Sequence, residues 1–147
     1  MKTTVQLSGF KELDAALGEL PKATGYNVLR RVLVKAGEPL AAGMRDRAPK
    51  EQGDLAEGIT VSTARPKAKK RTKKTSAVEV VIGPGQHPQG SLQEHGTVNH
   101  SPHPFVRPAW DEGRAEALDT IGQELGGEIE KAAKRLAKRR ARAAKKG

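Results

Sequence analysis

The side chains best suited to chemistry in this chain are histidines, and three of the four lie close together: His95, His100 and His103. Two histidines three residues apart would share one face of a helix and could bind one metal ion there. The neighbouring prolines exclude a helix at this place, and an extended segment points positions 100 and 103 to opposite faces. Glu94 is the only acid between residues 80 and 110, so the pattern does not predict a metal site.

The other patterns that could support catalysis are incomplete. Ser91 and Ser101 lie near histidines, but neither has the strand–turn–helix surroundings of an activated serine. The stretch GPGQHPQG, residues 83–90, is a predicted loop without the GK[ST] ending of a phosphate-binding loop. The chain contains no cysteine, which excludes disulfides and cysteine nucleophiles. We therefore expect a protein that is not an enzyme and that uses no cofactor or metal ion.

Charge is distributed unevenly along the chain, whose formal net charge is +10. Residues 65–74 hold seven basic side chains and residues 131–147 hold nine, with no acid in either run. The rest of the chain therefore holds 11 of the 27 basic residues and all 17 acids. Such runs commonly meet polyanions or acidic protein surfaces, although a solubilising role also explains them. The candidate contacts to DNA or a protein partner in the first run are Lys67, Lys69, Lys70, Arg71, Lys73 and Lys74.

Neither basic run contains an aromatic residue that could stack on bases, so any nucleic-acid binding would use the phosphate backbone. No apolar run approaches the roughly 20 residues that cross a bilayer, and the first residues lack the apolar core of a signal peptide. We expect a soluble, cytoplasmic protein without membrane contact.

Local patterns in the first third of the chain predict one strand and two helices. A short strand over residues 3–10 is followed by a short helix that Pro21 ends. A long helix with one apolar face begins at Tyr26, and Pro49 stops it. Pro39 lies inside this helix and predicts a kink or a split into two helices.

Beyond the long helix, the stretches 57–65 and 76–83 are β-rich and predict an antiparallel hairpin around the first basic run. Residues 91–97 fit either a third short strand or a helical turn. The last helix is expected to begin near Pro108 and to fray beyond Leu136, where its apolar face fades.

These elements predict an α+β fold, in which a small antiparallel sheet packs against a long kinked helix and a C-terminal helix follows. Residues 1–130 would form a single domain with a flexible basic loop at 65–76, and residues 131–147 a basic extension.

Residues 94–110, EHGTVNHSPHPFVRPAW, then have a mechanical interpretation. Gly96 allows a tight turn, and three prolines hold the following chain extended. Phe105 and Trp110 supply large apolar anchors on either side of the start of the last helix. The segment is predicted to fix the angle at which that helix leaves the sheet.

Six motifs of the chain together resemble one known family of proteins. They are GFKELDAALGELP (9–21), LRRVLVKAGEPL (29–40), APKEQGDLAEGI (48–59), VVIGPG (80–85), EHGT (94–97) and PHPFVRPAW (102–110). In these motifs and their order the chain resembles the small tail-component proteins of long-tailed phages, the tail-completion or head–tail joining family. The motif positions to which we give a structural role are Pro49, Gly53, Leu55, Gly96, Pro104, Phe105, Arg107, Pro108 and Trp110.

The resemblance implies a structural virion protein, a tail terminator or neck component that forms a ring, hexameric by preference. Its partners would be the tail tube protein and the head-closure or connector protein, with DNA passing through the ring. Such a protein is assembled in the host cytoplasm and ends in the virion. The alternative is a small nucleic-acid-binding protein that uses its basic loop and tail.

Neutralising Lys69, Lys70, Arg71, Lys73 and Lys74 together tests the first basic run. If its role is electrostatic, the fold stays intact while binding to DNA or a partner weakens, most strongly at low salt, where screening is least. Binding of wild type and variant at low and high ionic strength is the measurement. Equal binding at both, with normal particle assembly, would show that the run is only a solvated insertion.

Overall fold

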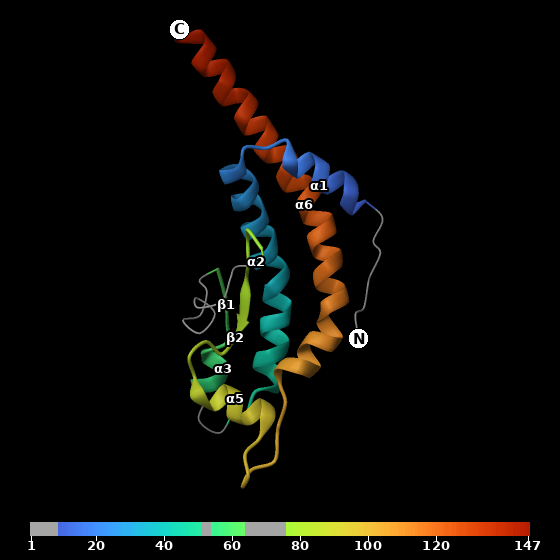
Figure 1. Cartoon of the computed structure of the whole chain (residues 1–147), viewed down its shortest axis with the longest axis vertical. Coiled ribbons are helices and arrows are strands. Elements are labelled where there is room, and N and C mark those ends of the chain that lie inside the picture. The colour runs from blue at the N-terminus through green and yellow to red at the C-terminus, as the bar shows by residue number, and fades with distance from the viewer. Residues whose placement is uncertain (1–8, 51–53, 64–75) are drawn as a thin grey trace.

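The computed structural model describes residues 9–50, 54–63 and 76–147. Most of the expected first strand, the basic loop at 65–74 and Gly53 lie outside these residues. The elements, in chain order, are α1 (Phe10–Gly18), α2 (Lys22–Arg47), α3 (Asp54–Glu57), β1 (Thr60–Ser62), β2 (Val81–Gly83), α5 (Pro88–His95) and α6 (Val106–Lys145) (Figure 1). The predicted α+β class is confirmed: a small antiparallel sheet lies beside a long helix, and a long C-terminal helix follows.

The long helix α2 continues through Pro39, so the expected split into two helices does not occur. Pro39 lies on the exposed side of α2, next to the exposed Glu38. Its ring removes one amide donor from the helix, and at an exposed position water can satisfy the carbonyl that loses its partner. The buried side of the same helix is uninterrupted, which is why α2 keeps its packing face.

The predicted hairpin is confirmed, although its strands are only three residues long. They pair antiparallel, with Val61 opposite Ile82. Both side chains pack on α2 at Gly37, where a Cβ atom would lie 3.0 Å from Ile82 and 3.2 Å from Val61. Arg45 of α2 adds a forked pair of hydrogen bonds, at 3.0 and 2.8 Å, to the carbonyl of Ile59 just before β1.

Helices α2 and α6 run antiparallel along most of the molecule, as Figure 1 shows. Three ion pairs bridge them: Arg31–Glu128, Lys35–Glu124 and Arg47–Glu112. From one ion pair to the next, the residue number in α2 rises by four and then by twelve, while the residue number in α6 falls by four and then by twelve. The two helices therefore keep one register over four turns. Exposed pairs of this kind contribute about 1 kcal/mol at most, so apolar packing must supply most of the stability.

That apolar packing is divided into two clusters of buried residues. The lower cluster joins α2, α3 and the start of α6, and consists of Ala41, Met44, Ala48, Leu55, Ile59, Phe105 and Ala109. The upper cluster joins α2 to the middle of α6, and consists of Val28, Val32, Leu125, Ile129 and Ala132. Helix α1 covers the upper cluster, with Leu13 and Leu17 packed against it.

Two sequence expectations for the second half are wrong in part. The loop predicted over 83–90 ends early, because α5 begins at Pro88, a favourable first helical residue. For residues 91–97 the two alternatives were a third strand and a helical turn, and the helical turn is correct. Fraying beyond Leu136 does not occur, and α6 continues to Lys145. Residues 137–145 are all alanine, lysine or arginine, which have high intrinsic helix propensities and extend a helix that is already formed.

Among the helices of the described residues, none combines the length and the apolar character that crossing a bilayer requires.

The two predicted aromatic anchors differ in burial, and this difference can be measured. Phe105 is fully buried, whereas Trp110, contrary to the expectation for it, is 49% exposed. We expect Phe105→Ala to lower the free energy of unfolding by about 3–5 kcal/mol, as for other buried aromatics. Trp110→Ala should cost about 1 kcal/mol or less. Chemical denaturation followed by circular dichroism measures both, and equal losses would contradict the description of the lower cluster.

Candidate assembly surfaces

One buried carboxylate joins α5 to the start of α6. The Oε2 atom of Glu94 accepts hydrogen bonds from the backbone amides of Phe105, at 2.8 Å, and Val106, at 2.9 Å. Its Oε1 atom accepts from the backbone amide of Arg107 and from the Nε of the Arg107 side chain, both at 3.0 Å. The Nη2 of Arg107 also donates to the Glu94 carbonyl at 3.0 Å. We call this set of contacts the Glu94 clamp.

The clamp meets a need that every helix has at its first turn. The first backbone amides of a helix have no partner within the helix, and a cap usually comes from the residue just before it. In α6 that residue is Phe105, which cannot cap, and its side chain makes no capping hydrogen bond. Glu94 supplies the acceptor instead, and its negative charge is favoured at the positive end of the helix dipole.

The electrostatics of Glu94 follow from this geometry. Burial of the carboxyl raises its pKa, because water no longer solvates the charge. The hydrogen bonds from the backbone amides of Val106, Phe105 and Arg107, and from the Arg107 side chain, outweigh that effect, so the pKa of Glu94 lies below its ordinary value. Glu94 therefore stays charged in the folded protein although it is only 6% exposed.

Between the two partners of the clamp, residues 96–104 form a loop that we call the tip loop; it lies at the end of the molecule opposite the C-terminus in Figure 1. Gly96 begins it with φ of 75°, and a Cβ atom there would lie 2.8 Å from the carbonyl oxygen of His100. Thr97 and His100 exchange both backbone hydrogen bonds, at 2.8 and 3.3 Å. These bonds hold the turn, and they leave the side chain of Val98 fully exposed at its end.

The histidines of this loop come closer than predicted, since the rings of His100 and His103 lie 5.4 Å apart between centroids rather than on opposite faces. The turn at 97–100 brings the chain back on itself, which the assumption of a straight extended segment missed. In the part of the chain that the structure describes, no three metal-ligating side chains gather into a site.

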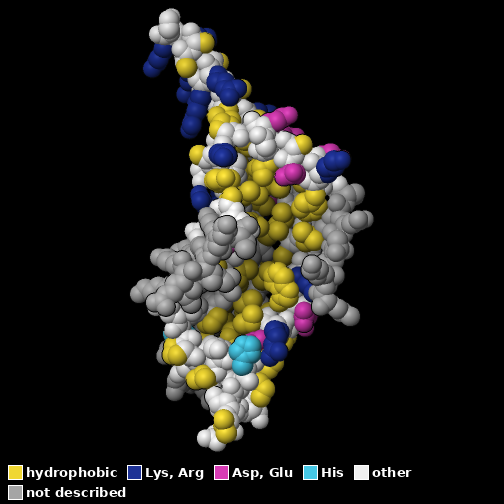
Figure 2. All heavy atoms as spheres, viewed as in Figure 1, with side chains coloured by type: hydrophobic (Ala, Val, Ile, Leu, Met, Phe, Trp, Pro, Cys, Tyr) yellow, Lys and Arg dark blue, Asp and Glu magenta, His cyan; other side chains and the backbone are white. Residues whose placement is uncertain are grey.

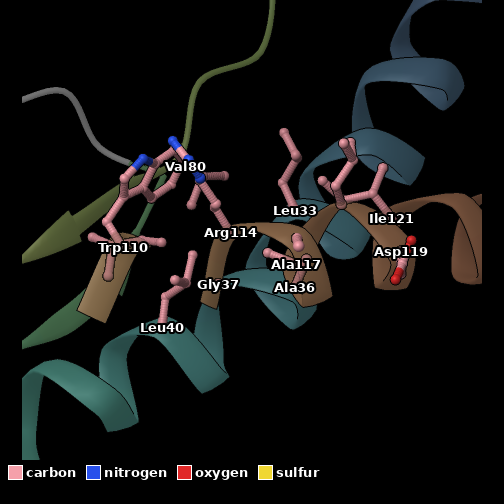
Figure 3. Close-up of a pocket in the computed structure, with 13 residues that line it drawn as sticks. Leu33, Ala36, Gly37, Leu40, Val80, Trp110, Arg114, Ala117, Asp119 and Ile121 are labelled. Carbon is pink, nitrogen blue, oxygen red and sulfur yellow. The ribbon is translucent and has the colours of Figure 1, made fainter. Parts of the chain in front are cut away.

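A second surface lies where α2, β2 and α6 meet. It is a hollow of about 670 Å³ with mainly apolar walls, which we call the apolar groove (Figure 3). Figure 2 shows the hydrophobic side chains gathered along the middle of the molecule. The lining residues are Leu33, Ala36, Gly37, Leu40, Val80, Ile82, Trp110, Arg114, Ala115, Ala117, Leu118, Asp119 and Ile121.

At its lower end the groove is closed by a close approach of α2 and α6. A Cβ atom on Gly113 would lie 2.7 Å from the Cδ2 atom of Leu40, and one on Gly43 would lie 3.5 Å from the Cβ of Ala109. Trp110 lines the groove with about half of its surface exposed.

The structure unites some of the predicted motif residues and separates others. Leu55 and Phe105 meet in the lower cluster, and Gly96 and Arg107 serve the clamp. Pro49 follows the end of α2 as predicted, and Pro104 is exposed. Pro108 is the third residue of α6 rather than its first. The candidate basic residues Lys67, Lys69, Lys70, Arg71, Lys73 and Lys74 lie outside the described residues, as does Gly53.

Sequence reasoning missed Glu94 and the apolar groove. The sequence did carry a signal for Glu94, which is the only acid between residues 80 and 110. If such a carboxylate is buried, it needs hydrogen-bond donors to compensate its charge. The groove had no such signal, because its lining residues come from three elements far apart in the sequence.

Comparison with known proteins adds one finding. The family model described as "Bacteriophage HK97-gp10, putative tail-component" matches residues 11–96. The matched segment includes both strands and Glu94 but ends before α6. Neither the curated proteins nor the solved structures give a match.

Replacing Glu94 by Gln tests the clamp. The amide keeps the shape but loses the charge and one acceptor, so we expect the free energy of unfolding at pH 7 to fall by about 1–3 kcal/mol. Because the pKa of Glu94 is depressed in the folded state, its stabilisation is present above its ordinary value of 4.5 and is lost as pH falls below that value. The difference between wild type and variant should therefore shrink at pH 3.5.

The matched control is Glu112→Gln in α6, which removes the exposed partner of Arg47 in α2. It should cost about 1 kcal/mol or less. Urea unfolding at both pH values measures all three proteins, and a Glu94→Gln difference that is the same at both would exclude the charged clamp.

Proposed function

The chain belongs to the HK97-gp10-like family of bacteriophage tail components, as its motifs indicated, and we propose that it is a tail terminator or head–tail joining (neck) protein that works as a closed ring of copies, hexameric by preference. The match to this family over residues 11–96 is the observation that supports the proposal most. A structural role in the phage tail follows from the family, and the position within the tail is our inference. We assign the protein no catalytic step.

A ring of identical subunits needs a heterologous contact, in which one surface of each copy meets a different surface of the next. The tip loop and the apolar groove are two such surfaces on one chain. The first protrudes and ends in the fully exposed apolar Val98, and the second is a recess with an apolar lining. We take the occupant of the groove to be the tip loop of a second copy.

The physical reason is the apolar surface that each feature leaves in water. Contiguous exposed apolar surface on a protein of this size usually marks an interface. Covering Val98 and the exposed half of Trp110 would bury two large apolar side chains, each worth about 1–3 kcal/mol when fully removed from water. Held by the backbone bonds of Thr97 and His100, the tip loop would lose little conformational freedom on docking.

The two axial faces of the ring would meet the tail tube protein on one side and the head-closure or connector protein on the other. In this proposal the protein is assembled in the host cytoplasm and ends in the tail or neck of the virion. The loop residues 65–74 remain candidate contacts to these partners or to DNA.

The mass of the assembled species tests the ring. Native mass spectrometry of the full chain, alone and with the purified tail tube protein, should give a closed oligomer in at least one of the two conditions. Val98→Asp should shift that oligomer toward smaller species without changing the circular dichroism spectrum, because a charge cannot enter the groove cheaply. Gln86→Asp, at another exposed loop position, should have no effect.

Trp110, the only tryptophan, reports on the groove itself. Its emission should move to shorter wavelength when the oligomer forms, and Val98→Asp should reduce that shift. A monomer in both conditions would contradict the ring. An oligomer whose formation leaves the emission of Trp110 unchanged would instead contradict the use of the groove.

A further inference from the structure

The last turns of α6 carry a one-sided distribution of charge. Nine basic residues and no acid lie between residues 131 and 147. At 100° per residue, eight of the nine fall within an arc of about 140° on the helix surface, and Arg140 alone lies on the opposite side. We call these eight the cationic stripe: Lys131, Lys134, Arg135, Lys138, Arg139, Arg142, Lys145 and Lys146.

The other side of the same helical segment is almost entirely alanine, with Leu136 as its one large apolar residue. Residues 137–147 are all exposed, and in Figure 1 this end of α6 extends beyond α1 and α2. Within the described residues, Lys131 forms an ion pair with Glu128 at 3.3 Å, and the rest of the stripe forms none with an acid. The stripe is about 22 Å long, and seven of its cations are available to a ligand.

A second feature lies at the root of the stripe. The beginning of α2 and the side of α6 enclose a hollow of about 160 Å³, lined by Thr24, Asn27, Arg31, Ala132, Arg135, Leu136 and Arg139. Three of these residues are arginines, and two of the three belong to the stripe. Arginine offers several donors in a flat fork, which suits phosphate oxygens.

The neighbouring acid does not cancel this charge. Glu128 pairs with Arg31 and with Lys131, each at 3.3 Å. The hydrogen bond from Lys131 is the largest influence on the pKa of Glu128 and lowers it. Burial acts in the opposite direction, but the charges of Lys131, Arg31 and Arg135 add to the hydrogen bond, so the pKa lies below its ordinary value. Glu128 thus remains one negative charge among several positive ones.

We propose that the cationic stripe and the arginine hollow at its root bind the phosphate backbone of duplex DNA without regard to sequence. A straight row of cations on one side of a helix matches a ligand with a regular row of anions. Duplex DNA carries one charge per 1.7 Å of its axis, or about 13 phosphates along the length of the stripe. The hollow would hold one phosphate where the row begins.

Other anionic ligands fit these residues less well. A helix that binds a membrane surface needs large apolar residues opposite its cations, and this one has Leu136 alone. Single strands are usually held by aromatic stacking, and no aromatic residue occurs beyond Trp110. Duplex RNA has a major groove too narrow for a helix. An acidic protein surface is the remaining rival, and competition by polyglutamate distinguishes it from DNA.

This inference does not depend on the ring. If the stripe variants described below weaken DNA binding as expected but the full chain stays monomeric, the proposed function fails and the stripe stands. If the ring forms and DNA binding is absent, the stripe fails and the ring stands.

The test uses two arginines in the same segment of the full-length protein. Arg142 lies in the stripe and Arg140 lies opposite it, so Arg142→Gln and Arg140→Gln remove the same charge from different sides. Glutamine has a helix propensity close to that of arginine, so helicity should be kept in both. Binding to a 30-base-pair duplex is measured by fluorescence anisotropy from 50 to 300 mM salt.

We expect Arg142→Gln to weaken binding about tenfold at 50 mM salt and to lower the slope of log K against log salt by about 0.9. The triple variant Lys138→Gln, Arg142→Gln, Lys145→Gln should lower the slope by about 3, as the loss of three phosphate contacts requires. Arg140→Gln should leave both quantities within error of wild type.

Equal losses in Arg142→Gln and Arg140→Gln would overturn the proposal, because the side of the helix would not matter. An unchanged slope in the triple variant would overturn it as well. Polyglutamate of matched charge that competes as strongly as the duplex would assign the stripe to an acidic protein surface instead of DNA.

Discussion

The carboxylate of Glu94 is the contact on which the rest of this structure depends, because it fixes where α6 begins and in which direction it runs. Three backbone amides and one guanidinium donate to it across 11 to 13 residues of chain. Because α6 is 40 residues long, the position of its first turn sets which of its side chains face α2 along the rest of its length. The two apolar clusters hold α6 alongside α2 from there on, and the ion pairs between the two helices add little.

With α6 held in this way, its two ends acquire different properties. The lower half faces α2 and β2 across the apolar groove, and the upper half carries the cationic stripe beyond the body. The family match covers α1 to α5 and stops before α6. The part of the chain that matches the family therefore ends at Glu94 and Gly96, just before the helix that carries the cationic stripe and one wall of the apolar groove.

Local sequence patterns predicted the α+β class and the antiparallel hairpin, because both follow from spacing and backbone chemistry. They failed where the outcome depends on surroundings. Pro39 did not split α2, since it lies on the exposed side, and Trp110 is not an anchor, since the groove leaves it half exposed. The Glu94 clamp needed knowledge of a turn at Gly96 that reverses the chain, and the groove needed three elements placed in space.

Hydrogen exchange at the first amides of α6 tests the central role of Glu94 most directly. First-turn amides of an ordinary helix have no acceptor and exchange rapidly with solvent. Residue-resolved exchange by NMR at neutral pH should show slow exchange for Phe105, Val106 and Arg107, and Glu94→Gln should abolish that protection while the upper cluster stays protected. Rapid exchange of these three amides in the wild-type protein would contradict the account, because the clamp would then not hold the start of α6.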